Sequence, residues 1–297
     1  MCSEAFALGI DIGGTHLRMG LVAKDGMVLH PETKSTEVLF GNDPTSLLGN
    51  LISDYLYQHN TAVISVCIGF PATVDKSRTT VLSAPNVKGF DGVPVGKLLS
   101  EQLGLPVWIE RDVNLLLLDD LKQLNIESDT VVACYVGTGV GNAILIDGHL
   151  LTGHNGVAGE LGHIPFGDAI ELCGCGNEGC AEPMVGGLRL ARLCKEVFCD
   201  TPISELFTKH KEHPLLTQYV ERLGRVIATE INLIDPELLI LGGGVIEMQD
   251  FPRDTLEQSI RSHSRKPFPE RNLKIRYSAA ENGVAGAGMF AWRKEQL

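Results

Sequence analysis

The chain of 297 residues is long enough for two compact lobes, and a chain of this size is expected to do its chemistry in a cleft. With 44% hydrophobic residues, 21% charged residues and 33 glycines, the composition indicates a folded globular protein rather than a disordered or fibrous one. The formal net charge of -12 disfavours a polyanionic partner, so we expect neither nucleic acid nor a membrane surface as a partner.

The N-terminal residues lack the cationic segment and long apolar run of a signal peptide. No apolar run in the sequence approaches the roughly 18 residues that a membrane-spanning helix needs. We therefore expect a cytoplasmic protein whose eight cysteines are reduced. In that setting, the tight cluster of Cys173, Cys175 and Cys180 indicates a metal site before a disulfide.

The first part of the chain is predicted to open with three short strands, at residues 6–11, 17–23 and 27–34. Helical spacing and buried-type apolar runs then predict a helix, a strand, a helix and a strand, at residues 47–58, 63–69, 95–102 and 107–110. This alternation is typical of an α/β fold.

The same order begins again after a helix at residues 115–124. Strands are predicted at residues 130–136, 142–146, 238–241 and 274–278, and helices at residues 215–234 and 284–293. The order of elements therefore repeats in two halves, and we place the lobe boundary near residues 118–126. The predicted N-terminal lobe comprises residues 1–118 joined by the C-terminal helix 284–297, and the larger C-terminal lobe comprises residues 119–283.

Two glycine loops occupy equivalent places in the two halves. The sequence Asp11-Ile12-Gly13-Gly14-Thr15 follows the first strand of one half, and Gly137-Thr138-Gly139-Val140-Gly141 follows the first strand of the other. Glycine lets the main chain approach a ligand closely, and its N–H groups can point at phosphate oxygens. Either loop alone could be a tight turn, and neither is a Walker or G-x-G-x-x-G motif. As a pair they favour phosphate binding, in which Asp11 could hold a water of hydrated Mg²⁺ and Thr15 could bind a phosphate oxygen.

With these loops the chain resembles, almost end to end, the ROK family of sugar kinases and repressors. The resemblance implies an α/β, two-lobed actin-like (ribonuclease-H-like) ATPase fold with a duplicated βββαβα unit and a central cleft. It also implies ATP with Mg²⁺, contacted by Asp11, Ile12, Gly13, Gly14, Thr15, His16, Gly137, Thr138, Gly139, Val140, Gly141, Asn142 and Gly243. The family usually has Lys where this chain has His16, and glycine is common where it has Asn142.

Asp112 lies where a short apolar strand gives way to a helix, which presents a side chain at the carboxyl edge of a sheet. Phosphoryl transfer to an alcohol requires a base for the hydroxyl proton. Asp is also a favoured helix N-cap, and from the local sequence alone that alternative stays open. The resemblance implies that Asp112 is the catalytic base.

A sugar site is indicated by Glu160 and His163, which lie three residues apart and can face one side of a helical turn. A carboxylate can accept hydrogen bonds from two adjacent sugar hydroxyls, and a histidine can donate or accept. The resemblance adds Glu182 and Asn86 to the sugar contacts. Arg111, directly before Asp112, stands where the family commonly has Asn, so we expect this larger cation to alter specificity.

The substrate implied by the resemblance is a hexose, phosphorylated on its 6-hydroxyl. The motifs Gly69-Phe70-Pro71-Ala72, residues 11–16, residues 111–115 and Phe251-Pro252-Arg253 are most similar to those of members that act on D-allose. Glucose, fructose, mannose and N-acetylmannosamine remain alternatives. The family also implies a homodimer.

Two other functions, a transcriptional repressor and an assembly protein, fit the sequence less well. A ROK repressor carries a helix-turn-helix before the first glycine loop, whereas only ten residues precede Asp11 here. An actin-like assembly protein would leave Glu160, His163 and Glu182 without a role.

The spacing His163-x9-Cys173-x-Cys175-x4-Cys180 predicts structural Zn²⁺. Intervening glycines allow the sharp turns that bring three thiolates to one point. A closed Cys3His tetrahedron leaves no position for an activated water, so a catalytic zinc is not expected. We expect His163 to bind zinc with one ring nitrogen and the sugar with the other.

Overall fold

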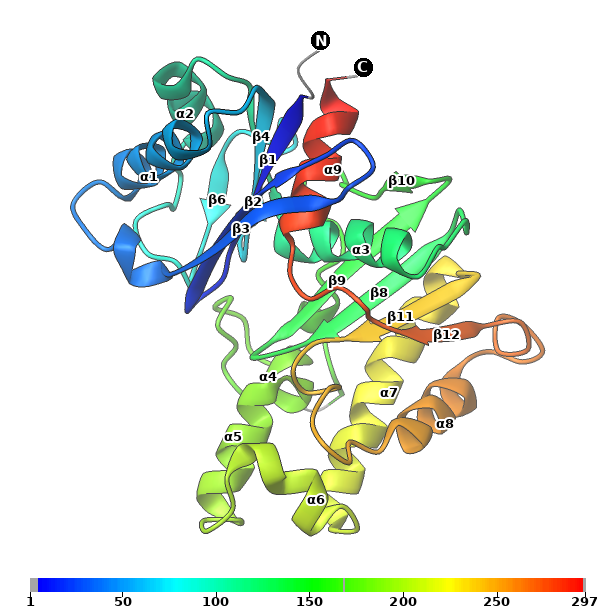
Figure 1. Ribbon diagram of the computed structural model, residues 1–297. Coiled ribbons are helices and arrows are strands. Elements are labelled where there is room, and N and C mark those ends of the chain that lie inside the picture. Colours follow the sequence, from blue (N-terminus) through cyan, green and yellow to red (C-terminus); the bar gives the residue numbers. More distant parts are fainter. Residues whose placement is uncertain (1–4, 168, 296–297) are drawn as a thin grey trace. The chain divides into compact units, whose positions relative to one another are not determined.

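The computed structural model describes residues 5–167 and 169–295, which divide into two compact units (Figure 1). Unit 1 contains the chain up to Ile126, the segment Thr152–Ala158 and the chain from Ala279 onward. Unit 2 contains Glu127–Leu151 and Gly159–Ser278. Residues 1–4 of the predicted N-terminal lobe and residues 296–297 of the predicted last helix lie outside the described residues.

Unit 1 is built on a five-stranded sheet in the order β3-β2-β1-β4-β7. Its strands are β1 (Phe6–Ile12), β2 (His16–Val22), β3 (Val28–Ser35), β4 (Val63–Phe70) and β7 (Val107–Arg111). β1, β2 and β3 form an antiparallel meander, whereas β4 and β7 run parallel to β1. The carboxyl ends of β1, β4 and β7 therefore share one edge, and the first glycine loop and Asp112 follow two of these strands.

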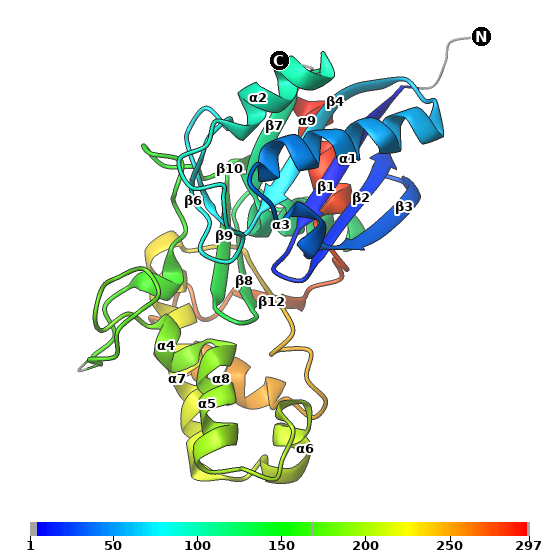
Figure 2. The same ribbon diagram turned by 90° about the vertical axis from the view of Figure 1, so that its left-hand side faces the viewer.

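Helices cover both faces of this sheet (Figure 2). Helices α1 (Pro44–His59) and α2 (Val95–Leu103) pack on one face, and α3 (Asp112–Gln123) and α9 (Val284–Lys294) pack together on the other. α1 begins with Pro44 after Asp43, whose carboxylate accepts a hydrogen bond from the Ser46 N–H. Smaller elements are the 3-10 turn η1 (Thr36–Leu39) and strands β5 (Thr73–Val74) and β6 (Val81–Ser83).

The last helix packs so closely on the first strand that the main chains of the two elements lie side by side. A Cβ added at Gly9 of β1 would lie 2.1 Å from the Val284 carbonyl oxygen, so glycine is required where α9 crosses the strand.

Unit 2 repeats the same sheet order, as β10-β9-β8-β11-β12. Its strands are β8 (Val131–Val136), β9 (Val140–Ile146), β10 (His149–Leu150), β11 (Leu238–Gly242) and β12 (Lys274–Tyr277). β8, β9 and β10 are antiparallel, and β11 and β12 run parallel to β8. The duplication expected from the sequence is confirmed.

The helices of unit 2 surround a core centred on α7 (Pro214–Ile234) and β8. Leu216, Val220, Leu223, Ile227 and Ile231 lie on one face of α7 and are fully buried, as the apolar spacing predicts. The remaining elements are α4 (Glu182–Val185), α5 (Gly187–Glu196), α6 (Leu206–His210), α8 (Arg253–His263), η2 (Leu161–His163) and η3 (Ile203–Glu205). The sequence reasoning did not predict α4, α5, α6 or α8.

In the described part of the chain, every helix is too short or too polar to span a membrane.

Candidate active site

The first glycine loop joins β1 to β2, and its residues 14–16 are exposed. The Gly13 N–H donates to the His16 carbonyl at 2.8 Å, and the Thr36 hydroxyl donates to the Gly13 carbonyl at 2.8 Å. A Cβ added at Gly14 would meet no atom within 4 Å. Hydrogen bonds therefore fix the ends of the loop, while the space beside Gly14 stays open, and such a loop suits a phosphate group.

Asp11 precedes this loop, near the end of β1, and is buried. Arg18, its partner in the β1–β2 register, places Nη1 3.5 Å from Asp11 Oδ2. Burial raises the pKa of Asp11, while the Gly283 N–H and the positive charge of Arg18 act to lower it. A carboxylate fits the oxygen ligands and ordered waters that Mg²⁺ takes. Arg18 was not predicted as part of this site.

Asp112 is the first residue of α3, directly after β7, and its Oδ1 accepts a hydrogen bond of 2.8 Å from the Val113 N–H. The N-cap position belongs to Arg111 instead. Burial, followed by the negative charge of Asp11, raises the pKa of Asp112 to about 7, against the opposing effects of the Val113 N–H and Arg111. A carboxyl with this pKa is poised near neutral pH, as a general base requires.

Asn86 and Arg111, the other two predicted sugar contacts of unit 1, differ in exposure. Asn86 is exposed in a turn that the Val87 N–H closes by donating to the Ala84 carbonyl at 3.1 Å. Arg111 is 7% exposed, and its Nη1 donates to the Ala158 carbonyl. Its guanidinium thus has a structural partner inside unit 1, and a sugar contact from Arg111 stays a prediction.

The second glycine loop, in unit 2, joins β8 to β9. Residues of α4 and α5 form hydrogen bonds with it. The N–H groups of Gly187 and Leu188 donate to the carbonyls of Gly137 and Thr138 at 2.8 and 3.1 Å. The Val140 N–H donates to Glu182 Oε2 at 2.9 Å. These bonds fix the loop's main chain and leave Gly137 with open space where a Cβ would stand.

Glu182 and Gly243 both pack closely beneath this loop. A Cβ added at Gly139 would lie 2.2 Å from Glu182 Oε2. Gly243 follows β11 with a φ of 91°, and a Cβ there would lie 2.7 Å from the Val136 N and O atoms. Glycine is thus required at Gly243, where main-chain atoms leave no room for a Cβ, whereas at Gly139 the contact is with the end of the Glu182 side chain.

Two predicted nucleotide contacts bury their side chains. Ile12 is 0% exposed within the core of unit 1. Asn142 is also 0% exposed, and its Nδ2 donates to the Ala133 carbonyl at 3.0 Å and to Glu230 Oε2 at 2.8 Å. Burial raises the pKa of Glu230 to about 8. At Ile12 and Asn142, only the main chain can reach a nucleotide.

The four predicted metal ligands are brought together in unit 2. One ligand atom from each of His163, Cys173, Cys175 and Cys180 lies within 4.8 Å of the others. Tetrahedral zinc would separate two sulfurs by about 3.8 Å, and a sulfur from a nitrogen by about 3.5 Å. The Cys175 and Cys180 sulfurs are 3.7 Å apart, and the Cys173 sulfur is 3.5 Å from His163 Nδ1. The donor set and its spacing fit structural zinc.

The second ring nitrogen of His163 faces Glu160. His163 Nε2 lies 3.6 Å from Glu160 Oε2, and both side chains are partly exposed. Because Nδ1 faces the thiols, Nε2 is the ring nitrogen that faces the Glu160 carboxylate. This arrangement fits His163 as a metal ligand through Nδ1, and a sugar contact through Nε2 stays a prediction.

A family model described as the ROK family matches residues 7–296. The chain belongs to the ROK family. A glucokinase from Thermotoga maritima is 28% identical over 261 residues, which cover 80% of this chain and 81% of that protein. A ROK-family glucokinase from Streptomyces griseus, solved in complex with glucose and AMPPNP, is 26% identical and superposes with a TM-score of 0.80 over 97% of this chain and 99% of that one.

A ROK hexokinase from Thermus thermophilus, 24% identical, has a TM-score of 0.83 and covers 98% of this chain and 99% of that one, which supports the fold. The fold is that of the actin-like ATPases. As a ROK-family sugar kinase, the chain is a phosphotransferase that acts on an alcohol group.

Two buried charges near Asp112 escaped the sequence reasoning. Arg78 is 2% exposed and Glu110 is 0% exposed, and Arg78 Nε lies 3.0 Å from Glu110 Oε2. Arg78 lies in a polar stretch that resembles a solvated turn. Glu110, in contrast, lies in a buried strand that was predicted from its apolar residues, and a buried charge of this kind requires a partner. That signal could have been read from the sequence.

Proposed function

We propose that this sugar kinase transfers the γ-phosphate of ATP to the 6-hydroxyl of a hexose. We propose D-allose as the preferred substrate and Asp112 as the general base. The observation that carries the proposal is Asp112 itself. It stands at the carboxyl edge of the unit 1 sheet with a pKa of about 7, next to the negative charge of Asp11. A carboxylate in this state can accept a hydroxyl proton near neutral pH.

In the proposed reaction, Asp112 takes the proton as the sugar oxygen attacks the γ-phosphorus and the bond from that phosphorus to the ADP oxygen breaks. The main-chain N–H groups of the two glycine loops orient the phosphates. Mg²⁺ bound with ATP supplies charge neutralisation on the transferred group, and Asp11 is the residue that would hold one of its waters.

The sugar hydroxyls are assigned to Asn86, Glu160, His163 and Glu182. A carboxylate accepts hydrogen bonds from hydroxyls, and His163 Nε2 can donate when Nδ1 is bound to zinc. The proposal for D-allose rests on the motifs around Arg111 and Ala72, whereas the named relatives support a hexose kinase more generally. The glucokinase from Streptomyces griseus was solved with glucose and an ATP analogue, which supports ATP and a hexose as the ligand pair here.

The test is a coupled assay of ADP release with D-allose, glucose, mannose, fructose and N-acetylmannosamine. We expect the highest kcat/KM with D-allose, a 6-phosphate product by NMR, and no turnover of a 6-deoxy hexose. A higher kcat/KM with another sugar would reassign the substrate. ATP consumption that no sugar increases would refute the kinase proposal.

A further inference from the structure

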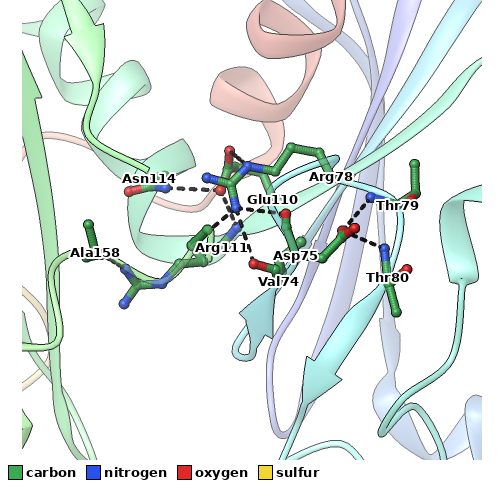
Figure 3. Close-up of polar contacts among 10 residues, drawn as sticks. Val74, Asp75, Arg78, Thr79, Thr80, Glu110, Arg111, Asn114 and Ala158 are labelled. Carbon is green, nitrogen blue, oxygen red and sulfur yellow. Dashed lines mark hydrogen bonds and ion pairs between the residues drawn. The ribbon is translucent and has the colours of Figure 1, made fainter. Parts of the chain in front are cut away.

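Two arginines of unit 1 hold one short segment by its carbonyl groups. The segment Thr152–Ala158 follows β10 along the chain, yet it belongs to unit 1. Arg78 Nη1 donates to the Gly156 carbonyl at 3.1 Å, and Arg111 Nη1 donates to the Ala158 carbonyl. Figure 3 shows the Arg78 guanidinium against Glu110 and the Arg111 side chain extending toward Ala158. The segment is thus fastened at two positions two residues apart.

The segment also lies directly on the main chain of residues 74–76. Gly156 has a φ of 89°, and a Cβ added there would lie 2.4 Å from the Val74 carbonyl oxygen. Arg78 Nη1 is 3.5 Å from that same oxygen, so one guanidinium contacts both pieces of backbone. Arg78 therefore joins two loops that are far apart in the sequence.

Glu110 fixes the guanidinium of Arg78 from the other side. Glu110 Oε1 accepts hydrogen bonds of 2.9 Å from both the Arg111 N–H and Asn114 Nδ2, while Oε2 faces Arg78 Nε. The Ile109 N–H of β7 in turn donates to the Arg78 carbonyl at 3.0 Å. The network thus connects Arg78 to the end of β7 through both side chain and main chain.

This arrangement is not expected to contribute much to the free energy of unfolding. Arg78 is held at a φ of 60°, a conformation that a residue with a Cβ rarely adopts. A buried ion pair is often no more stable than neutral residues of similar size. Both features favour a role in which the exact placement of backbone matters.

We propose that Arg78 is a positioning residue for phosphoryl transfer, which acts by fixing Gly156–Ala158 to the carboxyl end of β7. Asp112 directly follows Arg111, and Glu160 comes two residues after Ala158. The stretches that lead to the base and to a sugar ligand therefore start from one anchored network. Arg78 acts through the backbone that it holds, and the inference rests on the proposed function, since it concerns the same site.

The deciding variant is Arg78→Met combined with Glu110→Gln. Glutamine keeps an oxygen for the Arg111 N–H and Asn114, and the double change removes both buried charges without leaving one unpaired. The bonds from Arg78 to the carbonyls of Gly156, Val74 and Asp75 are then lost. We expect a melting temperature near that of the wild type, faster hydrogen exchange in residues 152–158, and a fall of about 10- to 100-fold in kcat/KM for the sugar.

The matched control is Arg261→Met in unit 2. Arg261 also binds two carbonyls, those of Glu270 and Leu273, at 3.2 and 3.1 Å. We expect this control to lower the melting temperature and leave kcat/KM unchanged. If the double variant does not fold, Arg78→Lys serves instead, because lysine keeps the charge beside Glu110 but has only one nitrogen to share with Gly156. It should show the same kinetic loss.

Wild-type turnover of a hexose is measured first, so a failure of the proposed function is seen separately. Hydrogen exchange of residues 152–158 does not depend on that turnover. Unchanged hydrogen exchange in residues 152–158 would overturn the positioning role. So would a kcat/KM for the sugar that changes only in step with the melting temperature, because the kinetic loss would then follow from reduced stability.

Discussion

The Glu182 carboxylate accepts a 2.9 Å hydrogen bond from the main-chain N–H of Val140, in the second glycine loop. Glu182 is also assigned to the sugar, and it follows the metal-cluster residue Cys180 by two positions. One side chain therefore supports the second glycine loop and comes from a segment that begins at the predicted metal cluster.

We expect Glu182→Ala to raise KM for ATP and for the sugar, each by about tenfold, because an unpaired N–H would loosen the loop. Glu182→Gln keeps an oxygen acceptor for Val140 and loses only the charge. It should raise KM for the sugar while KM for ATP stays near the wild-type value. Equal effects of both variants on ATP would show that the hydrogen bond does not order the loop.

Asp112→Asn should leave the fold and ATP binding intact and lower kcat by roughly two to four orders of magnitude, the range of a general base. Circular dichroism and nucleotide titration provide the controls. Near wild-type turnover would remove Asp112 from the base role.

The pH profile gives an independent test of Asp112. Its pKa is raised to about 7, so the carboxylate that accepts the proton forms only as the pH rises through that value. We expect kcat/KM to increase between about pH 6 and pH 8 and to fall below this range. The residual activity of Asp112→Asn should be flat there. An unperturbed Asp, which ionises near pH 4, would give a flat profile in the wild type.

Loss of the metal should weaken both stability and sugar binding. Cys175 is the exposed member of the cluster, and Cys175→Ser removes one thiolate. We expect a lower melting temperature, substoichiometric zinc by elemental analysis, and weaker sugar binding by calorimetry. Cys199→Ser is the control, since Cys199 is also exposed and lies outside the cluster. Full sugar affinity in a zinc-free variant would contradict the dual role of His163.

The buried Glu230 predicts a dependence of stability on pH. Burial raises its pKa to about 8 from an ordinary value of 4.5, so the unfolded chain releases this proton at a lower pH than the folded one. Its contribution to the free energy of unfolding therefore falls as pH rises from about 4.5 to 8. We expect Glu230→Gln to be more stable by on the order of 1–3 kcal/mol at pH 8 and equal to the wild type below pH 4. Denaturant titrations at both pH values measure this difference.

Most of the fold could be predicted from patterns of residues that are close in the sequence. Strands at residues 6–11, 63–69 and 238–241 were predicted because short buried apolar runs end in glycines or turns, and the metal cluster was predicted because its ligands are close in the sequence. Helix α3 begins at Asp112, three residues before its predicted start, because the polar residues of its first turn interrupt the apolar spacing.

The features that escaped prediction depend on residues far apart in the chain. Asn142 was expected at the nucleotide, and nothing local shows that its side chain would meet Glu230, 88 residues later. Arg78 and Gly156 are likewise 78 residues apart. A buried polar group finds its partner through tertiary packing, and hydrophobic periodicity carries no information about that choice.

The packing of α9 on β1 bears on how the protein is made. The sheet of unit 1 begins with Phe6, but the helix that packs on β1, β2 and β4 starts only at Val284. During synthesis the apolar surface of β1 and β4 must therefore wait for nearly the whole chain, while unit 2 already has all of its strands and helices outside the ribosome. Unit 1 is then the part most prone to aggregation or chaperone binding. A chain that ends shortly before residue 284 would keep the apolar surface of β1 and β4 exposed.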